Sequence, residues 1–131
     1  LIHLSAFVSL TLHVLIASIF YIHLLEYQRG NLMADYIQTH ALDKSNISYY
    51  GFNGMHSLDY NVDFDFPVDT ELKNGRMYIL DANTKQTLDQ KDETYTLMHT
   101  IQSFGVSNLS GRFLDPSKRS KVLSEYYLIG K

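Results

Sequence analysis

The first 25 residues form one apolar run, whereas the rest of the chain mixes short apolar and polar stretches. Residues 1–25 contain no Asp, Glu, Lys or Arg. About 20 helical residues at roughly 1.5 Å each cover a hydrocarbon core of about 30 Å. A cleaved signal peptide would have a charged start and a shorter apolar stretch. We therefore predict a single transmembrane helix over 1–25, in preference to a signal segment or a buried core helix.

The polar residues of this run lie mainly on one side of the expected helix. At about 100° per residue, a face roughly 80° wide carries four of them, namely Ser5, Ser9, His13 and His23. Lipid offers these side chains no hydrogen-bond partner, whereas a neighbouring helix does. In the alternative interpretation, Ser and Thr bond back to carbonyls of their own helix. We expect this face to bind a partner helix.

The Ser9-x-x-x-His13 spacing resembles the anchor helices of the TonB/TolA family, which dock on a proton-driven motor. The resemblance covers this one helix. In that family a further Leu and Ser continue the stripe, where this chain has Phe20 and Leu24. The long Pro-rich spacer of the family has no counterpart, since the chain contains two Pro in all.

Beyond residue 25 the pattern predicts a small mixed, mostly antiparallel α+β domain outside the membrane. Apolar residues at helical spacing between Leu32 and Ala41 predict a stem helix within 26–45, at the membrane surface. Residues 46–131 are expected to fold as the domain. Its expected elements are a helix over 94–104 and strands over 47–53, 76–80, 85–88, 106–113 and 121–129, the last also compatible with a helix.

The strongest alternation runs from Leu58 to Asp69. Apolar residues occupy every even position, and Asp, Asn or Pro occupies every odd one. This period of two predicts one long strand with the even side chains in the core and an acidic face outward. Pro67 donates no backbone hydrogen bond, so the end of this strand is expected at a sheet edge.

The acidic face carries Asp59, Asp63 and Asp65, spaced at about 7 Å along a strand. Three interpretations stay open: a solvated face that discourages edge aggregation, a surface for a basic partner protein, or a site for a hard cation. An EF-hand loop is excluded because Phe64 stands where its glycine is required. We include these three residues with the helix face as candidate partner-binding residues.

Composition narrows the classes of function further. A length of 131 residues indicates one domain, and the absence of Cys excludes a disulfide scaffold, a Cys-ligated zinc site and a thiol nucleophile. A net charge of -3 is unlike a nucleic-acid binder. No P-loop, Rossmann glycine pattern, G-x-S-x-G or H-E-x-x-H motif is present. We expect no enzyme, no cofactor, and no catalytic or metal-ligating residues.

Tyrosine pairs are the other recognition signal. Tyr49-Tyr50 and Tyr126-Tyr127 would each place one ring on either face of a strand. One member of each pair is then available to the surface, and exposed Tyr is common in recognition surfaces.

Two functions of different classes fit these expectations. The first is a non-catalytic, single-pass accessory or structural subunit of a larger membrane protein complex, in contact with lipid and other transmembrane helices. The alternative is the extracytoplasmic input region of a transmembrane signalling receptor such as a bacterial sensor kinase. Because the flank after the first helix is poor in basic residues, residues 30–131 are expected outside the cytoplasm.

The order of the expected elements supports the receptor alternative. A membrane helix, a stem helix and a mixed sheet with a turn such as Leu80-Asp81-Ala82-Asn83 resemble periplasmic sensor domains of the PAS/Cache kind. We favour the accessory subunit at this point, because the polar helix face needs a neighbour and the sequence has no ligand-pocket signature.

Overall fold

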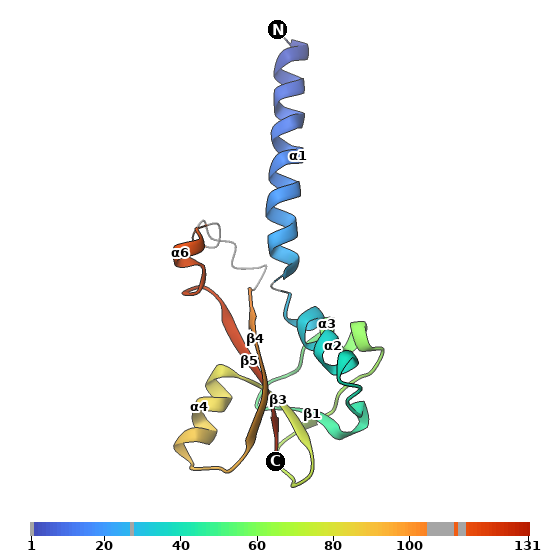
Figure 1. The fold of residues 1–131 in the computed structure, drawn as a ribbon, viewed down its shortest axis with the longest axis vertical. Coiled ribbons are helices and arrows are strands. Elements are labelled where there is room, and N and C mark those ends of the chain that lie inside the picture. Colours follow the sequence, from blue (N-terminus) through green and yellow to red (C-terminus); the bar gives the residue numbers. More distant parts are fainter. Residues whose placement is uncertain (1, 27, 105–111, 113–114) are drawn as a thin grey trace.

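A computed structural model of the chain describes residues 2–26, 28–104, 112 and 115–131 (Figure 1). A long helix, α1 (Ile2–Glu26), projects from a domain built around one five-stranded sheet. Helices α2 (Arg29–Thr39) and α3 (His56–Val62) cover one face of the sheet, and α4 (Ala82–Gln90) covers the other. A single 3-10 turn (Lys44–Asn46) and the short α6 (Pro116–Arg119) complete the described helices.

The sheet is mixed, as expected from the sequence. Its order is β2-β1-β3-β5-β4. Strand β1 pairs in parallel with both of its neighbours, while β5 pairs antiparallel with both of its own. Two parallel pairings therefore correct the expectation of a mostly antiparallel sheet. The strands are β1 (Ile47–Tyr50), β2 (Val68–Asp69), β3 (Met77–Asp81), β4 (Thr96–Ser103) and β5 (Ser124–Gly130).

The first apolar run does form a helix, but the prediction of a membrane span is wrong. Side chains of α1 are described for residues 4–18. Within the described part of the chain, no helix combines the length and apolarity that crossing a membrane requires. This finding overturns both the transmembrane helix over 1–25 and the single-pass membrane localisation, with residues 30–131 outside the cytoplasm, that was built on it.

The alternating segment 58–69 is not one long strand. Its first part forms α3, which ends at Asp63 in the left-handed region with φ of 51°, and only Val68–Asp69 pair as β2. Leu58 and Val62 are buried, whereas Tyr60 between them is 87% exposed. Positions four apart share a side in a helix and in a strand alike. The alternation therefore fitted both structures at these two positions, and the left-handed Asp63 ends the helix.

Two further elements have the type opposite to the one predicted. Residues 85–88 lie in α4, because Asp81 caps this helix by accepting a hydrogen bond from the backbone N–H of Thr84 at 2.8 Å. Residues 96–103 form the strand β4, whose Ile101 and Ser103 are buried two positions apart. The predicted strand over 106–113 lies outside the described residues, except for residue 112.

Alternate residues of β1 help to build two separate cores. Ile47 and Tyr49 pack with α2 and α3, beside Met33, Ile37, Leu58 and Val62. On the opposite face, Tyr50 packs against the cluster of Tyr78, Leu80, Leu88 and Ile129 beneath α4. The expectation that a Tyr pair places one ring on each strand face is thus confirmed for Tyr49 and Tyr50.

A pair of alanine substitutions distinguishes the helix from the strand that alternation predicted. Leu58→Ala should lower the free energy of unfolding by about 2–5 kcal/mol because its side chain is fully buried. Tyr60→Ala should stay within about 0.5 kcal/mol of wild type because that ring is exposed. Urea denaturation of both variants measures this. Equal losses of unfolding free energy at the two positions would contradict the helix and support the predicted strand.

Candidate functional site

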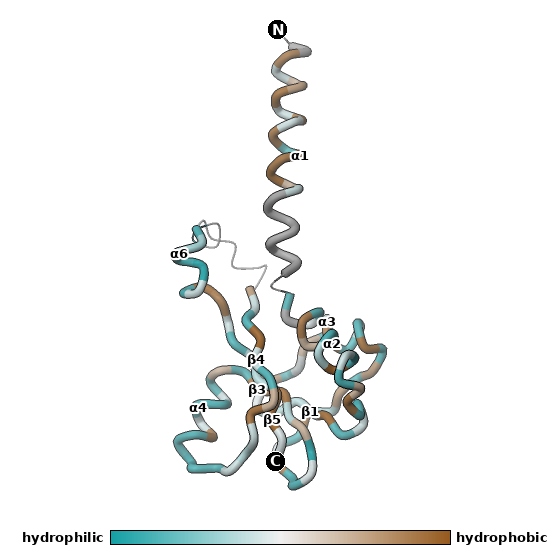
Figure 2. The backbone as a smooth tube through the Cα atoms, in the orientation of Figure 1, coloured by the Kyte–Doolittle hydropathy of each residue, from teal (hydrophilic) through white to brown (hydrophobic). Residues whose placement is uncertain are grey.

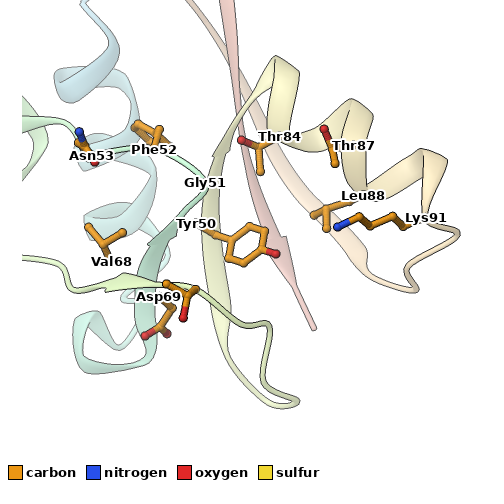
Figure 3. Close-up of a pocket in the computed structure, with 11 residues that line it drawn as sticks. Tyr50, Gly51, Phe52, Asn53, Val68, Asp69, Thr84, Thr87, Leu88 and Lys91 are labelled. Atoms are coloured by element: carbon orange, nitrogen blue, oxygen red, sulfur yellow. The ribbon is translucent and has the colours of Figure 1, made fainter.

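A pocket of about 420 Å³ opens where β1 and β2 end, beneath α4 (Figure 3). Tyr50 and Val68 come from the strands, and the loop after β1 adds Gly51, Phe52 and Asn53. The α4 side of the pocket is formed by Thr84, Thr87, Leu88 and Lys91. The volume lies within the range typical of small-molecule sites, about 300–1,000 Å³.

The topology explains why a hollow forms here. Strands β1 and β3 are parallel neighbours, yet the chain leaves β1 toward α3 on one face and leaves β3 directly into α4 on the other. Connections that diverge in this way leave a crevice at the carboxyl ends of the strands. Ligands of open α/β sheets bind at such points.

Glycine holds the crevice in its present shape. Gly51 has φ of +80°, a region that L side chains rarely adopt. A Cβ at this position would lie 2.4 Å from Thr84 Oγ1. Only glycine therefore lets the loop after β1 pass this close to the first turn of α4.

Two hydrogen-bond donors point into the pocket from opposite sides. The Tyr50 hydroxyl extends from β1 and the Lys91 ammonium reaches back from the end of α4, so that each is directed toward the other (Figure 3). Among the described residues neither side chain makes a hydrogen bond or a salt bridge. These two groups are therefore available to a ligand.

The carboxylate that borders the pocket is already neutralised. Asp69 forms a salt bridge with Arg76 at 3.1 Å, and both side chains are largely shielded from solvent. The guanidinium of Arg76 also donates to the carbonyl of Ser45 at 3.2 Å. Of the two charged side chains that line this pocket, Asp69 is therefore paired and Lys91 is not.

A polar network fastens α4 over the sheet. Lys85 forms a salt bridge with Asp89 at 2.8 Å, and its Nζ lies 5.4 Å from the centre of the Tyr127 ring. The Tyr95 hydroxyl donates to Asp89, and the Tyr127 hydroxyl donates to Glu125. The latter hydrogen bond, together with burial, raises the pKa of Tyr127 to about 12. The Tyr95–Asp89 hydrogen bond and the contact of Lys85 with Tyr127 join α4 to the segment before β4 and to β5.

A second hollow, of about 610 Å³, lies between α2 and β4. Tyr36 stacks on His99 with ring centres 3.9 Å apart and contacts the His40 ring at 4.1 Å. The His40 Nδ1 donates to the carbonyl of Tyr36 at 3.0 Å. Burial, and to a smaller extent the neighbouring His40, lowers the pKa of His99. This aromatic group joins α2 to the outermost strand.

The three predicted aspartates are brought together, although not on a strand. Asp59, Asp63 and Asp65 line a hollow of about 420 Å³ with His56. Asp59 accepts a hydrogen bond from the buried Tyr49 hydroxyl at 2.7 Å, so it has a structural task. Among the described residues, no group of three or more His, Asp or Glu is arranged to hold a metal ion. Binding of a basic partner at this surface stays a prediction.

Thr11, His13 and Ser18 of α1 each form a side-chain hydrogen bond with a carbonyl of their own helix. His13 Nδ1 donates to the carbonyl of Ser9 at 2.7 Å, and Thr11, on another face, donates to that of Phe7 at 2.8 Å. Ser5 also has an interaction partner, while the side chain of His23 lies outside the described residues. This pattern follows the alternative of backbone bonding, and partner binding by this face stays a prediction.

No family model, curated protein or solved structure matches this chain. The site must therefore be interpreted from its own geometry. Sequence analysis missed Lys91 and the threonines of α4, because α4 was expected to be a strand. The Tyr49-Tyr50 pair was the one signal in the sequence that pointed to this place.

We expect His99 to titrate below its ordinary pKa of about 6.5. Because the fold favours neutral His99, the protein should lose stability as the pH falls from about 6.5, the value expected in the unfolded chain, through the lower pKa of the folded state. NMR titration of its ring signals measures the pKa directly. His40→Gln should raise that pKa only in part, since burial is the larger cause. His56→Gln, in a different hollow, is the control, and a His99 pKa of 6.5 or higher would contradict the assignment.

Proposed function

We propose that this chain is a non-catalytic input domain that binds a small molecule and passes its occupancy to the N-terminal helices. The observation that carries the proposal is the crevice at the ends of β1 and β2, with Tyr50 and Lys91 directed into it (Figure 3). The pocket combines apolar walls with a few converging polar groups, which is the usual composition of ligand sites.

A continuous set of contacts connects the pocket with α2. The loop after β1 borders the pocket and leads directly into α3. Tyr49, next to Tyr50, holds the start of α3 by donating to Asp59 at 2.7 Å and to the carbonyl of Met55 at 3.3 Å. Gly30 of α2 lies so close to α3 that a Cβ there would meet the backbone of Leu58 at 2.6 Å. A ligand that shifts the loop would therefore displace α3 against α2.

The helix α1 favours a second candidate, a subunit of a larger assembly. Its large apolar side chains from Leu4 to Ile16 are 53–67% exposed, and apolar positions recur along the described length of the helix (Figure 2). Apolar area of this extent on a helix is normally covered. The two interpretations are compatible, and partner binding by the polar face of α1 stays a prediction.

Filling the pocket should abolish ligand binding. Thr87 lines the pocket, whereas its neighbour Gln86 is exposed on α4 and does not. A library of small metabolites screened by thermal shift should give compounds that stabilise wild type and Gln86→Trp but not Thr87→Trp. Compounds that stabilise both variants equally would place binding elsewhere. If no compound stabilises any of the three proteins, the proposal of an input domain is contradicted, and the subunit of a larger assembly becomes the favoured function.

A further inference from the structure

We propose that the pocket takes a small organic carboxylate with an aromatic or apolar body. This inference rests on the proposed function, because it names the class of ligand for the same site. The Lys91 ammonium and the Tyr50 hydroxyl would bind the carboxylate, and the rings and methyl groups around them would pack against its body.

The balance of charge selects an anion. Lys91 forms no salt bridge among the described residues, not even with Asp92, which follows it in the chain, and three other nearby carboxylates are paired with other cations. Asp69 pairs with Arg76, Asp89 pairs with Lys85, and Glu93 pairs with Lys131. The pKa of Glu93 is lowered mainly by Lys131 and only least by Lys91. The ammonium of Lys91 is therefore not committed to a salt bridge within the described residues and can pair with an anionic ligand.

The arrangement of donors favours a carboxylate over a phosphate. Phosphates commonly bind at free backbone N–H groups of a helix N-terminus or at guanidinium groups. The first turn of α4 borders the pocket, but Asp81 already accepts the Thr84 N–H there at 2.8 Å. Arg76 is paired with Asp69. The donors that remain are one ammonium, from Lys91, and neutral groups such as the hydroxyls of Tyr50, Thr70 and Thr84. One positive charge with neutral donors beside it suits a single negative charge shared by two oxygens.

The walls of the pocket suit an apolar body about the size of one ring. Leu88 is buried and the Tyr50 ring is half-buried, whereas Val68 is 52% exposed in this structure. The accessible part of the Tyr50 ring offers apolar area that a bound molecule would cover. The volume of about 420 Å³ lies near the lower end of the range for ligand sites.

Benzoate and its uncharged isostere benzamide test the inference on the whole chain. Calorimetric or NMR titration should give benzoate about a tenfold advantage over benzamide, as expected for one charge-assisted hydrogen bond. Lys91→Met should remove most of this advantage and leave benzamide binding unchanged. Tyr50→Phe should reduce it while keeping the ring. Lys121→Met removes the same charge from an exposed lysine that does not line the pocket, and should bind as wild type does.

The outcomes separate the ligand class from the proposed function. If benzamide binds as tightly as benzoate and Thr87→Trp blocks both, the carboxylate inference is wrong and the pocket stands. Benzoate binding that survives in Lys91→Met, or falls equally in Lys121→Met, also overturns the inference. If neither probe binds, the carboxylate inference fails, and the metabolite library alone then decides the proposed function.

Discussion

The two-sided strand β1 is the constraint on which the rest of the structure depends. It pairs in parallel with β2 and β3, and its successive side chains enter different cores. Tyr49 is almost completely buried and anchors α3 through its hydroxyl, with edge-to-face contacts to Phe52 and Phe66. Tyr50 meets the cluster beneath α4 and borders the pocket. A shift of register by one residue would exchange these two roles.

The site follows from this arrangement rather than from any motif. Because β1 and β3 are parallel but continue on opposite faces, a crevice at their ends is unavoidable. Glycine at position 51 keeps the crevice narrow, and Lys91 reaches it from the far end of α4. Residues of the pocket thus come from three separate parts of the chain. Contacts through Tyr49 and Gly30 connect the strand that borders this crevice with α3 and α2.

Sequence analysis predicted the elements whose periods were unambiguous. The α+β class, the mixed sheet, α2 and the strands near 47–50, 77–81 and 124–130 follow the pattern of apolar residues. The sequence analysis was wrong at Leu58 and Val62, since residues four apart share a face both in a helix and in a strand. Residues 85–88 are helical because the Asp81 side chain caps α4. Residues 96–103 have apolar residues at helical spacing but form a strand, because they pair with β5 at the edge of the sheet. Convergence of Tyr50 and Lys91 is a tertiary property that no local pattern carries.

The central claim is that a ligand bound beside Tyr50, on one face of the sheet, changes the helices that pack on Tyr49, on the other face. Amide hydrogen exchange of the whole chain, with and without a ligand found by the pocket screen, measures this directly. The account predicts altered exchange in α3 (His56–Val62) and α2 (Arg29–Thr39), on the face opposite the ligand. Gly51–Asn53 and the end of α4 should change as well. Changes confined to the pocket, with α2 and α3 exchanging as in the free protein, would contradict the account.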